Sequence, residues 1–374
     1  MPVSGLRSRV IVEDSRRIAL SLPLGNKIAA LHPDDGFGLV EDPRSTSRAA
    51  IIGMMVLRPA ARRWSPRLDA AGFARDMGEI HDWCFDVAGV GGSWPISASN
   101  PFDAYRLALQ YGTVDAVMAG SSTIVREGIE HDAHRAHLWQ PYTPLSWPVL
   151  RAQRSTLEPA IARIRSRWQE LGVLSARRYP AQIAITQSGQ ASRSDVAGGS
   201  AGDVLDARIF DARHPDGSPV EAYLLTSAAG AERLRQRAMK RGRSIDSMLI
   251  IASAPDDPER IDVARVPGLI RSALDARLVQ HDGGATSLMA FVEAGAVCQL
   301  NFSLMRRRSV RDVLAASDRL DTTRRDEVLD EWPRAARLFP PLGGPLPGAL
   351  GHALAEEGPD GEAVAVTLDV RTQA

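Results

Sequence analysis

Short apolar runs alternate along the chain with segments whose apolar residues recur at helical spacing. Several of the runs are continuously apolar, which is typical of strands that are covered on both faces. Strands separated by helices predict an α/β fold, with a mostly parallel sheet flanked by helices. We expect strands at residues 49–57, 114–120, 181–186, 221–227, 248–253, 276–281, 298–304 and 363–370.

The clearest helical pattern covers residues 155–171, where Ser155 and Glu158 have the spacing of a capping box and Gly172 follows as a stop signal. The apolar run 363–370 follows a Pro/Gly-rich stretch and is expected to return to the sheet as an antiparallel edge strand. Further helices are expected at residues 102–111, 228–241, 268–276, 286–294, 309–320 and 323–338.

The chain is predicted to form one domain, because no internal repeat and no sharp linker divides its 374 residues. This domain covers residues 49–374, and residues 1–48 form an N-terminal extension or arm. Residues 188–203 are rich in Gly, Ser and Asp and predict a polar loop.

The composition is that of an ordinary globular protein, with 45 basic side chains balanced by 45 acidic ones. This balance leaves no basic field to hold nucleic acid or a membrane surface. No apolar run is long enough to span a bilayer, and the N-terminus lacks a signal-like core. Cys84 and Cys298 are interpreted as reduced, buried thiols, so we expect a cytoplasmic protein.

Two other motifs are weaker than their alternatives. Ser200 lies in a G-x-S-x-G pattern typical of hydrolases, but in a Gly/Ser loop instead of between a strand and a helix. His131, His134 and His137 only partly share a helix face and lack a completing ligand, so no metal site is expected.

The Trp-rich segment at residues 138–147 (LWQPYTPLSW) leaves two interpretations open. Its prolines predict an irregular segment packed over the sheet. The alternative is a pocket wall for a flat heterocycle, with Trp139 stacking on it.

One strand-to-helix junction is Gly120-Ser121-Ser122-Thr123, after an apolar strand. Gly120 leaves room for a ligand, and the hydroxyl groups add donors that suit a phosphate. The alternative is a simple helix N-cap, since Ser and Thr favour that position.

The second junction is Asp282-Gly283-Gly284-Ala285, again between a strand and a helix. Paired glycines permit a close ligand approach, and the helix N-terminus adds a partial positive charge. The alternative is a tight turn. Together the two junctions favour a dinucleotide bound from two sides.

These segments resemble the reductase domain of the bacterial riboflavin-pathway deaminase-reductase. Residues 103–123 (DAYRLALQYGTVDAVMAGSST) resemble its helix rich in Arg and Leu followed by D-A-x-x-x-G-x-x-T. Its later E-G-G and A-G-x-x-D-E-x strand are similar to residues 282–284 and 294–300 (AGAVCQL). Looser matches lie at residues 93–97, 183–188 and 224–227, and the resemblance covers residues 49–304 with gaps.

The resemblance implies a dihydrofolate-reductase-like sheet, NADPH as hydride donor and a homodimer. The basic helix at residues 233–243 is a candidate source of a cation for the cofactor's 2′-phosphate, and its alternative is a solvated face. The cofactor contacts that the resemblance implies are Gly120, Ser121, Ser122, Thr123, Thr186, Thr226, Ser227, Gly283, Gly284 and Ala285.

The chain departs from the family mainly in the part that holds the substrate. Residues 56–59 (VLRP) stand where the family often has S-L-D-G, Asp282 replaces a glutamate, and Cys298-Gln299 replace an Asp-Glu pair. The zinc-deaminase motifs of the bifunctional enzyme are absent.

The sequence therefore predicts an NADPH-dependent reductase that transfers a hydride to a small heterocyclic substrate of pyrimidine or pterin type, resembling the phosphoribosylaminouracil reductase of riboflavin biosynthesis. A carboxylic acid or an ordered water must deliver the proton. Asp282 is the candidate acid, and its alternative role is to cap the following helix. The lost acidic residues leave a second function open, a non-catalytic nucleotide-binding paralogue that acts as a sensor or partner protein.

Overall fold

The computed structural model describes residues 43–58, 82–84, 101–121, 123–125, 140–147, 150–189, 203–282, 285–304, 349–355 and 364–369. The strands of the main sheet are β1 (Ala50–Arg58), β2 (Asp82–Cys84), β3 (Ala116–Gly120), β4 (Ala181–Ile185), β5 (Ala222–Thr226), β6 (Leu249–Ile251), β9 (Leu278–His281), β10 (Gln299–Leu304), β11 (Ala349–Ala355) and β12 (Val364–Asp369). A separate small pair is formed by β7 (Ser253–Ala254) and β8 (Asp257–Ile261).

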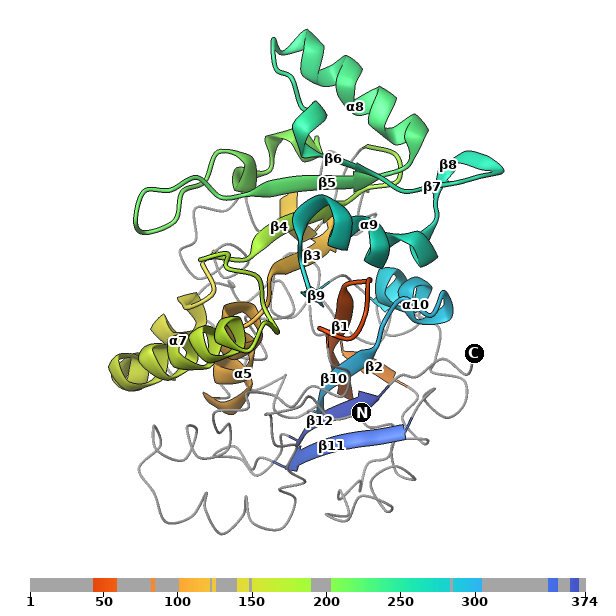
Figure 1. Cartoon of the computed structure of the whole chain (residues 1–374). Coiled ribbons are helices and arrows are strands. Elements are labelled where there is room, and N and C mark those ends of the chain that lie inside the picture. Colours follow the sequence, from red (N-terminus) through yellow and green to blue (C-terminus); the bar gives the residue numbers. More distant parts are fainter. Residues whose placement is uncertain are drawn as a thin grey trace, which may run out of the picture.

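The main sheet has the order β11-β12-β10-β1-β9-β3-β4-β5-β6, with β2 paired to β1 (Figure 1). Neighbours from β10 to β6 along this order are parallel. The predicted α/β fold with a mostly parallel sheet flanked by helices is therefore confirmed. Strands β2, β11 and β12 pair antiparallel.

The expected edge strand is correct in direction and wrong in position. β12 pairs antiparallel with β10, but β11 lies outside it. The sequence pattern missed β11 because the strand is rich in small residues and its register shifts between Leu350 and His352. The helices expected at residues 309–338 lie outside the described residues.

Helices cover both faces of the sheet (Figure 1). Helices α5 (Pro101–Gly112), α7 (Arg154–Glu170) and α8 (Ala228–Lys240) pack in one apolar core, and α9 (Val266–Leu274) and α10 (Ala285–Glu293) pack in the other. In the described part of the chain, none of these helices is long and apolar enough to cross a membrane. The 3₁₀ helices are η2 (Thr143–Ser146), η3 (Arg151–Gln153), η4 (Val204–Asp206), η5 (Arg208–Phe210), η6 (Asp246–Met248) and η7 (Val263–Arg265).

The capping box predicted for α7 does not form. The helix continues directly from η3, its N-cap residue is Gln153, and no side chain caps it. Glu158 instead pairs with Arg154 at 2.8 Å, one turn away. The preceding 3₁₀ turn places Ser155 inside the helix, so its hydroxyl is not at the end.

Cys298 is half-buried, and its thiol donates to the carbonyl oxygen of Ile51 at 3.2 Å. Trp147 is fully buried in the core beneath α5 and α7. The described end of the segment, residues 140–147, thus packs against the helices α5 and α7. Trp139 lies outside the described residues.

Candidate functional site

The carboxyl ends of β3 and β9 lie side by side where the sheet changes its direction of winding. The chain leaves β3 towards β4 through α7 on one face, and it leaves β9 towards β10 through α10 on the other face. Ligands of open α/β sheets bind outside the carboxyl ends of the strands at such a switch point. The two junctions identified in the sequence directly follow these two strands.

The first junction begins at Gly120, the last residue of β3. A Cβ atom at Gly120 would meet nothing within 4 Å among the described residues, so the space beside this strand end is open. Ser121 is buried and Thr123 is half-buried at the start of the helical turn that follows. Ser122 lies outside the described residues.

The second junction is attached to the first through the backbone. The N–H group of Asp282 donates to the carbonyl oxygen of Met118 at 2.7 Å, two residues before Gly120. α10 begins at Ala285, and Gly283 and Gly284 lie outside the described residues. Two segments that are about 160 residues apart in the sequence therefore meet at one end of the sheet.

The side chain of Asp282 is held by α5. Tyr111, which is fully buried at the end of this helix, donates its hydroxyl group to Oδ2 of Asp282. The bond fixes one oxygen of the half-buried carboxyl group and so orients the other. Tyr111 could be recognised from the sequence only as a residue of a helix, because its partner Asp282 lies 171 residues away.

His281 precedes Asp282 and is completely buried at the end of β9. Its Nε2 atom lies 3.1 Å from the hydroxyl oxygen of Ser287, and its ring packs edge-to-face on Phe291 with a centroid distance of 4.8 Å. Burial lowers the pKa of His281 from 6.5 to about 4. The imidazole is therefore neutral near pH 7 and places no charge beside the junction.

Two buried glutamines, Gln280 in β9 and Gln110 in α5, leave their amide groups without partners among the described residues. Gln280 is two residues before Asp282 in β9, so the two side chains are on the same face of the strand. Among the described residues, neither amide atom of Gln280 has a hydrogen-bond partner, and the same holds for Gln110 beside Tyr111. Both side chains are completely buried. Buried polar atoms of this kind are normally satisfied by ordered water or a ligand.

Three predicted cofactor contacts, Thr186, Thr226 and Ser227, lie at the ends of β4 and β5, and the last two use their hydroxyl groups internally. Thr226 is fully buried and donates to the carbonyl oxygen of Thr186 at 2.5 Å. Ser227 caps α8 by accepting from the N–H group of Gly230 at 3.0 Å, and it donates to the carbonyl oxygen of Gln187 at 3.1 Å. These bonds connect the start of α8 to the loop after β4. A cofactor bound at this place would therefore contact that loop and the start of α8.

The basic segment at residues 233–243 is covered by ion pairs. Arg233 holds both carboxylate oxygens of Glu259, at 2.9 and 2.7 Å. The remaining arginines pair with Asp203, Asp206, Asp211 and Asp246. A 2′-phosphate bound by one of these arginines would have to replace its carboxylate partner.

The other sequence motifs fall outside the described residues. They are Ser200 and the three histidines His131, His134 and His137. Tyr111, His281 and Gln280 are the site residues that the sequence interpretation missed.

No protein-family model matches this chain, and no curated protein matches it in sequence. Its structural neighbours are pyrimidine reductase-like proteins and riboflavin-biosynthesis reductases. A pyrimidine reductase-like protein from Corynebacterium diphtheriae shares 11% identity over 96% of this chain and 99% of its own, with a TM-score of 0.44.

Two further solved structures are similar to the chain with comparable sequence identity and TM-score. Acinetobacter baumannii RibD shares 13% identity over 88% of this chain and 60% of its own, with a TM-score of 0.39. The riboflavin biosynthesis reductase Rib7 from Saccharomyces cerevisiae shares 10% identity over 87% of this chain and 91% of its own, with a TM-score of 0.38. Likeness at this level assigns no activity to the chain.

Proposed function

We propose that this chain is an NADPH-dependent reductase that transfers a hydride to a small heterocyclic substrate of pyrimidine or pterin type. The observation that carries the proposal is the meeting of Gly120 and Asp282 at the switch point of the sheet, joined by the bond between Asp282 and Met118. The resemblance of the two junctions to the riboflavin-pathway reductases supplies the cofactor and the substrate class.

The residues at the switch point suit a dinucleotide. The open space beside Gly120 lets a phosphate approach the backbone, and Ser121 and Thr123 add hydroxyl donors. The start of α10 adds the partial positive charge of a helix N-terminus on the other side. Gln280 in β9 adds a buried amide without a hydrogen-bond partner among the described residues, on the strand face that Asp282 shares.

A bound nicotinamide supplies the hydride, and the protein supplies position and a proton. Asp282 holds the proton for the substrate at its carboxyl group. Tyr111 orients that carboxyl group through Oδ2, so the acid keeps one direction relative to β3. His281 stays neutral beside it, so the site has no fixed imidazolium charge that would compete with the substrate for the carboxylate.

Calorimetric titration of the purified chain with NADPH, and separately with NADH, tests the binding half of the proposal. We expect micromolar binding of NADPH with a clear preference over NADH. Binding of neither nucleotide would overturn the reductase assignment.

Catalysis is tested by NADPH oxidation with a panel of pterins, pyrimidines and quinoid compounds. Oxidation with one of these acceptors supports the proposal. Tight binding without oxidation of NADPH by any acceptor would instead favour the nucleotide-binding sensor or partner protein. A homodimer and a cytoplasmic location belong to the same proposal, and light scattering of the purified chain measures the first.

A further inference from the structure

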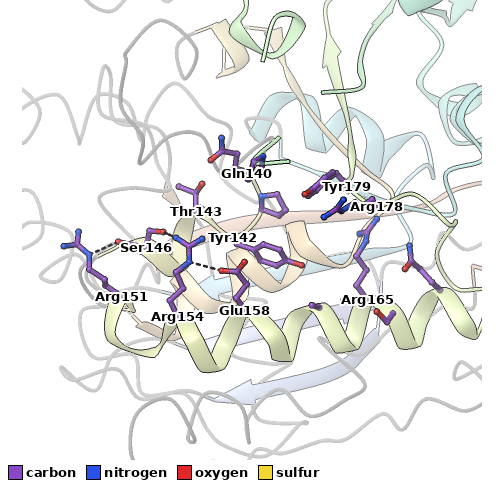
Figure 2. Close-up of a pocket in the computed structure, with 15 residues that line it drawn as sticks. Gln140, Tyr142, Thr143, Ser146, Arg151, Arg154, Glu158, Arg165, Arg178 and Tyr179 are labelled. Atoms are coloured by element: carbon purple, nitrogen blue, oxygen red, sulfur yellow. Dashed lines mark hydrogen bonds and ion pairs between the residues drawn. The ribbon is translucent and has the colours of Figure 1, made fainter. Parts of the chain in front are cut away.

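A cavity of about 780 Å³ lies along α7, away from the switch point (Figure 2). It is bounded by α7, the segment around η2, the residues before β4, and Pro215. None of the residues predicted to contact NADPH lines it. Its volume is within the range of small-molecule sites, so it has room for a ligand of its own.

The lining of this cavity is strongly basic. Four arginines, Arg151, Arg154, Arg165 and Arg178, face a single carboxylate, that of Glu158, which leaves three positive charges in excess. Arg154 pairs with Glu158 at 2.8 Å, and Arg178 pairs with Asp216 at 2.7 Å just beyond the lining. Both pairs are partly exposed, and exposed pairs are weak enough for the arginines to turn to another anion.

Arg165 gives the cavity a fixed buried cation. Only 6% of this residue is exposed, and its guanidinium group donates to the carbonyl oxygens of Gly112 and Val114 at 2.9 Å each, and to that of Arg177. In the described part of the chain, its Nε atom has no hydrogen-bond partner and no carboxylate forms an ion pair with it. Burial lowers the pKa of Arg165, and the carboxylate of Asp115 offsets part of this effect from beyond ion-pair distance. An anion in the cavity would therefore stabilise the buried charge further.

Two tyrosines provide the aromatic part of the lining. Tyr142 is half-buried and directs its ring into the cavity with the hydroxyl group towards Arg165 (Figure 2). Burial raises the pKa of Tyr142, so its phenol is a neutral donor at pH 7. Tyr179 is held in place by stacking on His214, with ring centroids 3.9 Å apart. Aromatic walls of this kind pack against a planar ring, and a phenol donates to an anionic oxygen.

We propose that this cavity is a second ligand site, which binds a small organic anion made of a planar ring and a phosphate or carboxylate group. The anionic group lies among the guanidinium groups of Arg154, Arg165 and Arg178, and the ring packs on Tyr142. The Trp-rich segment of the sequence thereby supplies a pocket wall through Tyr142, at a place separate from the reductase site.

The site is tested by calorimetry with phenyl phosphate and benzoate, which carry both a ring and an anion. Inorganic phosphate tests the anion alone, and benzyl alcohol tests the ring alone. We expect at least one ring-bearing anion to bind about tenfold more tightly than either partial probe. No binding of phenyl phosphate or benzoate, or equal binding of a partial probe, would overturn the proposal.

A variant locates the binding. Ala162 is half-buried on α7 and lines the cavity, so Ala162→Phe fills it without removing a core contact. Ala160→Phe is the matched control, since Ala160 is half-buried on the same helix and does not line the cavity. We expect Ala162→Phe to lower the affinity for the ring-bearing anion at least about tenfold and Ala160→Phe to leave this affinity unchanged. Undiminished binding by Ala162→Phe places the ligand elsewhere and contradicts the proposal.

The outcome is independent of the reductase site. NADPH titration of Ala162→Phe should match the unmodified chain, because the cavity shares no lining residue with the switch point. If a folded Ala162→Phe protein lost the binding of both NADPH and the ring-bearing anion, the two ligands would share one site. That result would overturn the proposal of a second site and leave the proposed reductase function standing.

Discussion

The carboxylate of Asp115 accepts the backbone N–H group of Arg277 at 2.8 Å, across 162 residues of sequence. The same carboxylate accepts from the N–H group of Leu278 at 3.2 Å and from the N–H and hydroxyl groups of Ser175 at 2.8 and 2.7 Å. It thereby ties the amino ends of β3 and β9 together and holds the segment that leads into β4. With the amino ends aligned, the junctions at Gly120 and Asp282 come together at the carboxyl ends.

Asp115→Asn should lower the free energy of unfolding by about 2–4 kcal/mol, because an amide NH₂ group would face donors that now have a carboxylate oxygen. Chemical denaturation of both proteins measures the difference. Asp256→Asn is the control, since Asp256 is exposed and forms an ion pair with Arg260, four residues further on, and the substitution should change the stability by less than about 1 kcal/mol. Equal effects of the two substitutions would show that Asp115 does not hold the strands.

Gly120→Val should abolish or weaken NADPH binding at least about tenfold while the fold is kept. The new side chain enters the open space beside the strand end, and valine is favoured in strands. Gly268→Val on α9 is the control, because a Cβ atom there also meets nothing within 4 Å. Calorimetry and thermal unfolding of both variants separate binding from stability, and unchanged affinity in Gly120→Val would place the cofactor elsewhere.

Asp282→Asn should reduce kcat for NADPH oxidation at least about a hundredfold, because an amide cannot deliver the proton. Tyr111→Phe should cause a smaller loss, about tenfold, since the acid is kept and only its orientation is lost. The dissociation constant of NADPH should stay within about threefold in both variants. Unchanged turnover in Asp282→Asn would remove this carboxyl group from the mechanism and leave it a structural role.

Gly230→Ala should destabilise the chain by about 1–3 kcal/mol, despite the better helix propensity of alanine. A Cβ atom at this position would lie 2.2 Å from the hydroxyl oxygen of Thr226 and 2.5 Å from the carbonyl oxygen of Gln187. Gly268→Ala, in open space on α9, should instead stabilise by up to about 1 kcal/mol. Denaturant midpoints give the sign of each change, and the same sign for both would refute the close packing of α8.

The stability of the chain should depend on His281 between pH 6.5 and about 4. The unfolded histidine takes up a proton below pH 6.5, whereas the folded one stays neutral until its pKa of about 4. The unfolded state binds more protons in this window, so the free energy of unfolding falls as the pH falls, by about 3 kcal/mol in total. Below pH 4 both states are protonated and the effect levels off.

His281→Gln removes this titration. The difference in unfolding free energy between the unmodified chain and the variant should be constant above pH 6.5 and should narrow between pH 6.5 and 4. Parallel stability curves over this window would mean that His281 titrates normally in the folded chain.

The sequence alone determined the elements and the local chemistry of both junctions. The strands β1, β3, β4, β5, β6, β9, β10 and β12 and the helices α5, α7, α8, α9 and α10 follow from the apolar pattern, because a buried strand or helix face requires apolar residues at regular spacing. Gly120 and Asp282 were identified for the same reason, since a strand end, a glycine and a helix start are local features.

Tertiary structure alone decided which of these elements meet. β9 is inserted between β1 and β3, and β11 rather than β12 forms the edge, because strand order depends on packing between distant segments and leaves no periodic signal. The bond from Tyr111 to Asp282, the buried imidazole of His281 and the arginine-lined cavity along α7 arise in the same way. Each requires side chains from separate elements to be brought together by the folded core.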